Sequence, residues 1–377
     1  WSWRKTMYQL ALHITPEQME HIATMLYKEM LRNGYTHVAE FHYLHHDPNG
    51  KPYAQLAEMS ERIMAGAQNA GIKITMIPIF YQQGGFGKEA EKDQRRFISN
   101  SIEDYSKLFE ACEISAAKYN DASVGYGIHS MRAVTSENII RLSKLKKENT
   151  PLHIHVSEQL KEIEECQSFL GKRPVEWLSN NIELNEDYHL IHATHLIEKE
   201  IEQIVNSGAS VVLCPSTEGN LGDGLFPLGE FLRKKGKWSI GTDSHIGINP
   251  LEEIRILDYG QRLITHSRNT FGNQNSADNG QIAIESALLN GRKAMGIDQE
   301  SFFEIGKPLD ALVLSSTHPL LQSASSKNRS NTIIYAGDSS MFNGTIVNGQ
   351  WKIEEGLHQN ANIDLNFIKT MNNLKVR

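Results

Sequence analysis

The stretch that decides the fold is "PLHIHVSEQL", residues 151–160. It contains an almost continuous apolar run with two histidines, and a glutamate follows at position 158. Because successive side chains of a β-strand point to opposite faces, His153 and His155 share one face. Strands with so few polar residues are typical of a parallel sheet that helices cover. The segment therefore predicts a buried parallel strand with imidazoles on one side.

Similar strand-like runs recur along the chain and alternate with helical patterns, such as residues 15–34, 53–71 and 136–149, the last with Ser136 as its expected N-cap. Repeated strand–helix units over some 250 residues predict an α/β protein with a (β/α)8 TIM-type barrel. A closed barrel of this type has eight strands, so we expect the first one to lie upstream of Trp1. The seven strand-like runs are residues 36–44, 73–81, 123–130, 152–159, 188–196, 210–217 and 238–245.

The pattern changes after about residue 304, where short strand-like segments are separated by Gly, Asn and Asp. We expect a barrel domain over residues 1–303, and over 304–377 the remnant of a small β-sandwich domain with a C-terminal tail. Residues 347–350, "VNGQ", predict a hairpin turn, and the tail from 358 to 377 is polar with a helical pattern. The short strands are expected within residues 305–316, 331–337 and 344–356.

Composition excludes several classes of partner. The net charge of −7 argues against nucleic acid or an anionic membrane as the main partner. No apolar run approaches the roughly 18 residues that a membrane-spanning helix needs. The three cysteines are far apart, and the opening "WSWRKTMYQL" lacks the apolar core of a signal peptide. We therefore expect a cytoplasmic protein without a disulfide framework.

Ionisable residues gather at the carboxyl ends of four predicted strands, which is where the active site of such a barrel lies. These residues are His129, His155, His192 and Asp243. A lone histidine on an apolar strand is usually a core residue, but four such strand ends favour metal chemistry. A buried aspartate is costly unless it is paired or bound to a cation. Asp243 has the alternative of a capping role or a place at the bottom of the barrel.

Other polar residues extend this candidate site. Glu158, at the rim, suits a proton shuttle, whereas His153 lies one layer deeper and supports packing or a ligand. Arg132 suits a substrate carboxylate, with a surface arginine as the alternative, and Tyr43 points into the barrel mouth if its strand is correct. The Gly- and Asn-rich loop 214–228 could line the pocket, with Cys214 as inert packing. Weaker candidates are His45, His46 and His195.

In combination, "LHIHVSEQ", "LIHATH", "LCPSTEGNLGDG" and "IGTDSH" resemble the deaminase branch of the metal-dependent amidohydrolase superfamily. The stretches "AEFHYLHHDPNGKPY", "HSMRAVT" and "EEIRILDYGQRL" narrow the resemblance, which runs from Trp1 to about Gly356. It implies a hydrolase that converts N-formimidoyl-L-glutamate to N-formyl-L-glutamate and ammonia in histidine degradation. It further implies one zinc ion per subunit, a small acidic amino-acid derivative as substrate, and a homodimer.

The resemblance also implies a role for individual residues. His155 and Asp243 would bind zinc, and Glu158, His192 and Asp243 would be catalytic. The substrate-binding residues would be His129, Arg132, Tyr43 and Arg4.

The family's first barrel strand carries a His-x-His pair with two further zinc ligands, and we expect it upstream of Trp1. Zinc binding by this chain alone would then be weak or absent. Two rival interpretations stay open. One is a related aminohydrolase that acts on guanine, cytosine or a similar ring, for which Arg132 would be out of place. The other is a metal-free barrel without catalytic activity.

Overall fold

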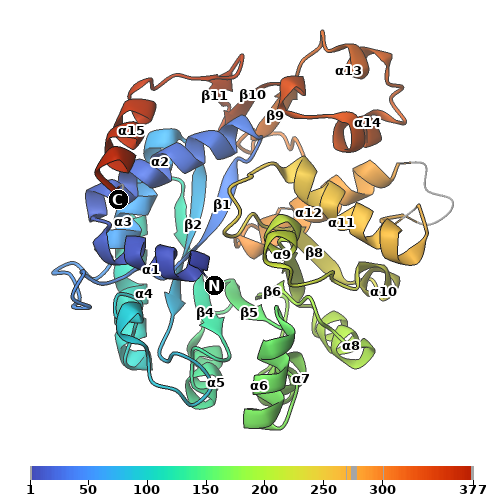
Figure 1. Cartoon of the computed structure of the whole chain (residues 1–377). Helices are drawn as coiled ribbons and strands as arrows, with labels where there is room; N and C mark the ends of the chain where they lie inside the picture. The colour runs from blue at the N-terminus through green and yellow to red at the C-terminus, as the bar shows by residue number, and fades with distance from the viewer. Residues whose placement is uncertain (1, 269, 273–277, 300, 375–377) are drawn as a thin grey trace.

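The computed structural model describes residues 2–268, 270–272, 278–299 and 301–374, and of residues 2–5 it describes the backbone alone. Its large sheet is parallel and curls into the wall of a barrel, in the order β1-β2-β4-β5-β6-β7-β8, with β3 beside β2 (Figure 1). The strands are β1 (His37–His42), β2 (Lys73–Phe80), β3 (Ala122–Val124), β4 (Tyr126–Ser130), β5 (Leu152–Val156), β6 (Tyr188–His192), β7 (Ser210–Leu213) and β8 (Lys237–Ile240).

These strands confirm the TIM-barrel-type fold and all seven strand-like runs that the sequence predicts. The run 123–130 is divided into β3 and β4 by Gly125. A Cβ atom at Gly127 would lie 2.2 Å from Cδ1 of Ile79 on the neighbouring strand, so a larger residue there would force buried side chains of β2 to shift. The two end strands of the order, β1 and β8, are not paired with each other in the described part of the chain.

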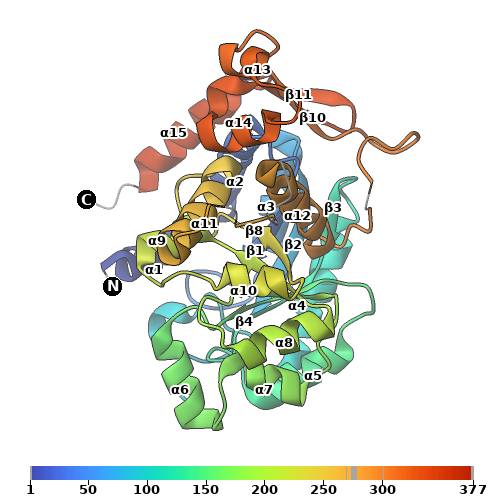
Figure 2. The ribbon, with the colours of Figure 1, turned by 90° about the vertical axis from the view of Figure 1, so that its right-hand side faces the viewer.

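Helices connect the strands and cover the outside of the curled sheet (Figures 1 and 2). They are α1 (Ser2–His13), α2 (Pro16–Arg32), α3 (Glu58–Ala70), the 3₁₀ turn η1 (Lys92–Gln94), α4 (Ile102–Ala116), α5 (Ser136–Leu145), α6 (Leu160–Leu170), α7 (Pro174–Asn181), α8 (Glu198–Ser207), α9 (Pro215–Leu221), α10 (Leu228–Arg233), α11 (Pro250–Thr265) and α12 (Asn279–Ala294). The N-cap of α5 is Thr135, whose side chain accepts the N–H of Asn138 at 3.4 Å, so the expected cap at Ser136 was wrong by one residue.

The main core lies between the outer face of the sheet and these helices. Phe80, Ile128 and Leu190, on three different strands, are each at most 1% exposed. Tyr105 of α4 stacks on Phe80 with 4.8 Å between the ring centroids. Full burial of such side chains stabilises the fold by about 1.5–3 kcal/mol each.

A layer of neutral imidazoles fills the inside of the barrel below the strand ends. His153 contacts the carbonyl of Ala294 at 2.7 Å through Nε2, and His189 contacts the Ser210 hydroxyl at 2.7 Å. The two rings lie 5.0 Å apart. Burial lowers the pKa of His153 to about 4. His153 therefore packs in the layer below the strand ends, as expected from its place two residues before His155.

A four-stranded antiparallel sheet, in the order β12-β11-β10-β9, forms the small β unit that the sequence predicts. The structure has a single sheet in this region, whereas the remnant of a β-sandwich was expected. The turn between β10 and β11 confirms the predicted hairpin, because Asn348 and Gly349 both have positive φ, at 52° and 74°. The strands are β9 (Ala311–Leu314), β10 (Phe342–Val347), β11 (Gln350–Glu354) and β12 (Leu357–His358).

The segment 331–337 was expected to be a strand, and that prediction was wrong. It belongs to helix α14 (Arg329–Ala336), which packs against α11 and α12. The Tyr335 hydroxyl donates to Asp258 at 2.6 Å, and the Arg262 guanidinium lies 4.9 Å from the Tyr335 ring. These tertiary contacts outweigh the β-preference of the run "TIIY". The neighbouring short elements are α13 (Pro319–Ser323) and η2 (Ser339–Met341).

The C-terminal segment packs against the N-terminal helices. Helix α15 (Asn362–Leu374) confirms the helical tail and lies along α2, with a contact of 2.9 Å between His21 and Thr370 (Figure 1). Lys28 pairs with Asp364. The Thr345 hydroxyl of β10 donates to the carbonyl of Leu31 at 2.6 Å. Segments more than 300 residues apart in the sequence are thus joined.

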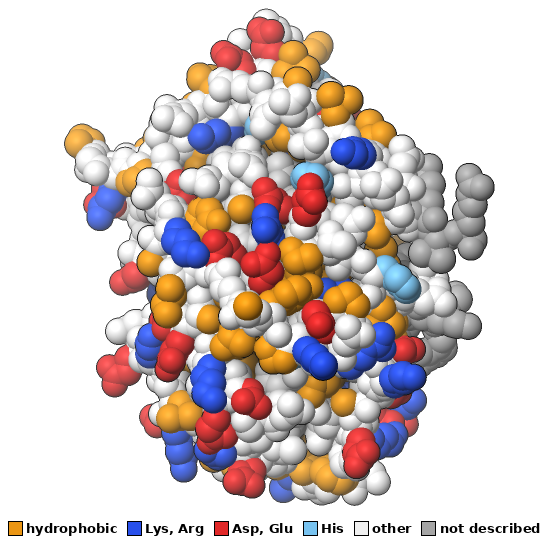
Figure 3. Space-filling model, turned by 90° about the vertical axis from the view of Figure 1, so that its left-hand side faces the viewer, with side chains coloured by type: hydrophobic (Ala, Val, Ile, Leu, Met, Phe, Trp, Pro, Cys, Tyr) orange, Lys and Arg blue, Asp and Glu red, His pale blue; other side chains and the backbone are white. Residues whose placement is uncertain are grey.

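Acidic and basic side chains are interspersed on the face of the molecule in Figure 3. None of the helices in the described ranges is both long and apolar enough to span a membrane.

Candidate active site

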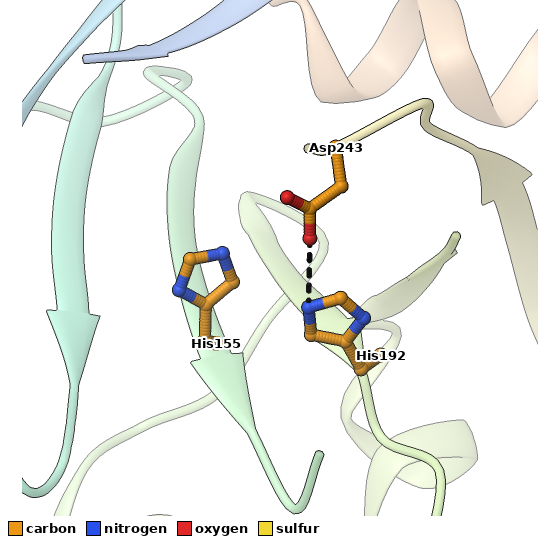
Figure 4. Close-up of side chains that lie close together, drawn as sticks. All are labelled: His155, His192 and Asp243. Atoms are coloured by element: carbon orange, nitrogen blue, oxygen red, sulfur yellow. Dashed lines mark ion pairs between the residues drawn. The ribbon is translucent and has the colours of Figure 1, made fainter. Parts of the chain in front are cut away.

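Three side chains from different strand ends converge inside the barrel mouth. His155, His192 and Asp243 each offer a ligand atom, and these atoms lie within 4.8 Å of one another (Figure 4). His155 lies on β5, His192 is the last residue of β6, and Asp243 follows β8 by three residues. Because parallel strands end at the same edge of a sheet, residues 88 positions apart in sequence meet here.

The backbone at this site is strained. His192 has a φ of 67° and Asp243 a φ of 47°, both in the left-handed region that residues other than glycine rarely adopt. Such conformations persist only where the surrounding structure enforces them, and they cluster at functional sites. The Asp243 carboxylate and the His192 ring point toward each other, and His155 lies beside them (Figure 4).

The electrostatics couple His192 to Asp243. The Nε2 atom of His192 lies 3.2 Å from Oδ2 of Asp243. Burial lowers the pKa of His192, but hydrogen bonds to Asp243, Cys214 and Glu218 outweigh it and raise the pKa well above its ordinary value. Burial acts to raise the pKa of Asp243, but its hydrogen bond to His192 acts in the opposite direction, and the pKa falls below its ordinary value. A positive charge is therefore strongly favoured between these two side chains.

The donor set fits a metal ion. Two imidazoles and one carboxylate are the nitrogen and oxygen ligands that zinc and related divalent ions prefer. Burial and the neighbouring charges of His129 and His192 lower the pKa of His155 far below its ordinary value, which keeps its imidazole neutral, as a ligand must be. These three residues could hold a metal ion, whose positive charge the Asp243 carboxylate would stabilise.

Glu158 stands beside this group at the rim. Its Oε1 lies 3.9 Å from Nε2 of His192, and its Oε2 lies 4.0 Å from a guanidinium nitrogen of Arg132. Burial raises the pKa of Glu158 to about 7, although His192 and Arg132 act in the opposite direction. Its backbone N–H donates to the carboxylate of Glu162 at 3.0 Å, which fixes the loop. A carboxyl group with this pKa can both donate and accept a proton near neutrality.

Aromatic side chains surround His129 next to His155. The His129 ring is 5.3 Å from His155, 5.6 Å from Tyr43 and 4.4 Å from Tyr81. Phe41 packs 4.2 Å from His155. The predicted group of His129, Tyr43 and Arg132 thus surrounds the same space as the three possible metal ligands.

The remaining predicted residues lie outside this group, or their side chains are not among those that the structure describes. His45 and His46 contact the backbone carbonyls of Ile79 and Ile98 through Nε2 at 2.9 and 2.8 Å, and His195 contacts that of Asp223 at 2.7 Å. These contacts with backbone carbonyls indicate structural roles, which agrees with the place of the three histidines among the weaker candidates. Arg4 lies in α1, but its side chain is outside the described residues.

Cys214 lies just beyond β7, at the start of α9, and is 2% exposed. Burial raises the pKa of its thiol to about 12, so the reactive thiolate is disfavoured. This agrees with inert packing.

Sequence reasoning missed Phe41, Tyr81 and Glu218. Phe41 could have been found from alternation, since it lies two residues before Tyr43 on the same face. Glu218 lies in the segment 214–228, which was expected to be a loop lining the pocket; that prediction was wrong for Pro215–Leu221, which form helix α9. Nothing in the local sequence of Glu218 identifies its partner. The structure places Glu218 Oε1 3.2 Å from Nδ1 of His192.

Comparison with known proteins gives consistent results. A model of the amidohydrolase family matches residues 1–352. The formimidoylglutamate deiminase of Pseudomonas aeruginosa is 41% identical over 361 residues, which is 95% of this chain and 79% of that protein.

Solved structures agree in fold. An amidohydrolase from Brucella melitensis is 39% identical and superposes with a TM-score of 0.92, over 99% of this chain and 82% of that one. An adenosine deaminase from Xanthomonas campestris with bound zinc has a TM-score of 0.77 at 20% identity, over 100% of this chain and 80% of that one. The second likeness concerns the fold alone.

Proposed function

The chain belongs to the amidohydrolase family and is a hydrolase of C–N bonds, and from this premise we propose that it converts N-formimidoyl-L-glutamate to N-formyl-L-glutamate and ammonia. One geometric observation carries the proposal. Arg132, an anion-binding group, lies 4.0 Å from Glu158, which itself lies 3.9 Å from His192. A carboxylate-bearing substrate would thereby be held at a fixed distance from the reacting groups.

His155 and Asp243 would hold one zinc ion per subunit, with His192 beside it as a catalytic group. The zinc would supply Lewis acidity, which would lower the pKa of a bound water to about 7. This assignment is supported by the short distances within the donor group and by the neutral state of His155.

The chain's own residues would move the protons. The carboxylate of Asp243 accepts a proton from the attacking water as its oxygen bonds to the formimidoyl carbon, and Nε2 of His192 orients that oxygen. Glu158 then donates a proton to the terminal nitrogen, and Asp243 passes on the proton that it accepted, so that the nitrogen leaves as ammonia. As the C–N bond breaks and the C=O bond forms, the remaining hydroxyl proton returns to Glu158. The sum is one water consumed and one ammonia released. General acid–base help of this kind is worth about 10²–10⁴-fold in rate.

The other end of the substrate would be held by the rim residues. Arg132 would bind a carboxylate through its guanidinium, and its side chain is 33% exposed. His129 and Tyr43 close the pocket beside it. Arg4 belongs to this proposal on the resemblance of its motif alone.

Three wider expectations are part of the proposal. We assign the barrel to residues 1–303 and an accessory unit to 304–377, and we expect a homodimer. Three buried free cysteines support a reducing location such as the cytoplasm.

The test is ammonia release from N-formimidoyl-L-glutamate by the zinc-loaded natural protein, compared with guanine and cytosine at equal concentration. Release from the formimidoyl substrate alone is expected. Release from a ring substrate alone would replace the proposal with the rival aminohydrolase. No release from any of the three by protein that retains zinc would reject it.

A further inference from the structure

Helix α9 carries a buried carboxylate that the mechanism above does not use. Glu218 is 3% exposed. Its Oε1 accepts the backbone N–H of Cys214 at 2.9 Å and lies 3.2 Å from Nδ1 of His192. Both contacts reach the same oxygen, so Glu218 joins the end of β7 to the end of β6.

We propose that Glu218 is a positioning residue for His192, an inference that rests on the proposed function. The Oε1 atom already accepts one N–H, and a carboxylate oxygen in that role requires the facing Nδ1 atom to carry a proton. His192 therefore donates through Nδ1 to Glu218. The opposite atom, Nε2, is then directed at Asp243, 3.2 Å away, and at Glu158, 3.9 Å away.

The ring needs such a partner. Rotation about the bond between Cβ and an aromatic ring has two broad, nearly equivalent wells. The neighbouring ring of His155 lies 5.3 Å away and inclined by only 24°, and stacking of that kind does not distinguish a nitrogen edge from a carbon edge. Without Glu218 the ring orientation would depend on the contacts with Asp243 and Cys214 alone, and a flipped ring would direct carbon atoms at Asp243. Partners of this kind typically change metal affinity or activity by about 10–100-fold when they are mutated.

The experiment compares Glu218→Ala with Glu218→Gln in the zinc-loaded natural protein. Ala removes the acceptor for both N–H groups, whereas Gln keeps an oxygen in its place. We expect Ala to lower kcat about 10–100-fold at an almost unchanged KM, because Glu218 does not touch the substrate. Gln should restore most of kcat. Crystal structures should show the His192 ring turned in the Ala variant and unchanged in the Gln variant.

Glu200→Gln is the matched control. Glu200 is a fully buried glutamate on α8 that pairs with Arg173 at 2.9 Å, outside the site, so its loss tests general destabilisation. Its kcat should equal that of wild type. A folded Ala variant with unchanged kcat and an unchanged His192 ring would overturn the inference, and so would a rise in KM alone. If wild type releases no ammonia, the proposed function fails, and the crystallographic ring orientation still decides the role of Glu218.

Discussion

The Oε1 atom of Glu158 lies 3.9 Å from Nε2 of His192, although Glu158 follows β5 by two residues and His192 ends the neighbouring strand β6. One carboxyl group is thus in reach of the imidazole, while its other oxygen faces Arg132 at 4.0 Å. Glu158 stands between the group that would bind the substrate and the groups that would perform the reaction. This arrangement makes the roles of the three residues separable by mutation.

Glu158→Gln should lower kcat by about 10²–10⁴-fold, because an amide cannot donate the proton that the leaving nitrogen needs. KM and zinc content should stay near those of wild type, since Glu158 is not among the three grouped metal donors. Steady-state ammonia release and metal analysis measure these quantities. Glu164→Gln, an exposed position on α6, is the control. Turnover within a few-fold of wild type would remove the proton-shuttle role.

Arg132→Met should raise KM about 10–100-fold with a smaller change in kcat, since a hydrogen bond to a charged group contributes about 1.5–3 kcal/mol. Ammonia release at varied substrate concentration gives both constants. Arg141→Met is matched in chemistry, because Arg141 is an exposed partner of Glu103 on the outside of the barrel, and it should leave KM unchanged. An unchanged KM in Arg132→Met would exclude this residue from the substrate site.

Removal of metal with a chelator should abolish ammonia release and lower the melting temperature, because a ligand that binds only the folded state stabilises it. Added zinc should restore both. His155→Ala should lose zinc, as measured by equilibrium dialysis, while His21→Ala on α2 should retain it. Full activity of chelated protein with no residual metal would contradict the metal assignment.

The unfolding free energy should depend on pH through Glu253. Burial raises the pKa of this carboxyl, which accepts from the N–H of Ser216 at 2.9 Å, to about 7. A folded-state pKa above the unfolded value means that stability is fully present below pH 4.5 and declines as pH rises through 7. A shift of this size corresponds to about 3 kcal/mol. Relative to wild type, Glu253→Gln should therefore become progressively more stable from pH 5 to 8 in urea titrations.

Glu176→Gln tests a pH dependence of the unfolding free energy that has the opposite sign. Hydrogen bonds from Lys199 and Lys172 lower the pKa of Glu176, so its contribution is present above pH 4.5 and is lost as pH falls further. That variant should be less stable than wild type by a constant amount from pH 5 to 8, and the difference should disappear as pH falls below 4.5. A flat difference between Glu253→Gln and wild type from pH 5 to 8 would show that Glu253 does not titrate in this range.

The features that sequence predicted well depend on periodicity. Alternation places His153 and His155 on one face, and the rule that parallel strands end together brings His155 to His192 and Asp243. Both follow from backbone geometry, which the local sequence determines. The choice of His155 over His153 also follows, because the residue nearer the carboxyl end reaches the mouth.

The features that sequence missed depend on tertiary contacts. The run "TIIY" has β-preferring residues, yet the bond between Tyr335 and Asp258 and the packing on α11 hold it in a helix. Glu218 could not be paired with His192, because their contact spans 26 residues and two strand ends. The positive φ of Asp243 likewise results from the loop that follows β8, and no residue type there signals it.

The contact between Thr345 and Leu31 has a consequence for the timing of folding. Its partners are 314 residues apart, and the pair between His21 and Thr370 is separated by 349 residues. At a synthesis rate of about 5–20 residues per second, Leu31 waits roughly 15–60 s for its partner. Helix α3, the main neighbour of α2, is synthesised soon after it, but throughout that interval the part of α2 that faces β10 and α15 stays uncovered on the nascent chain.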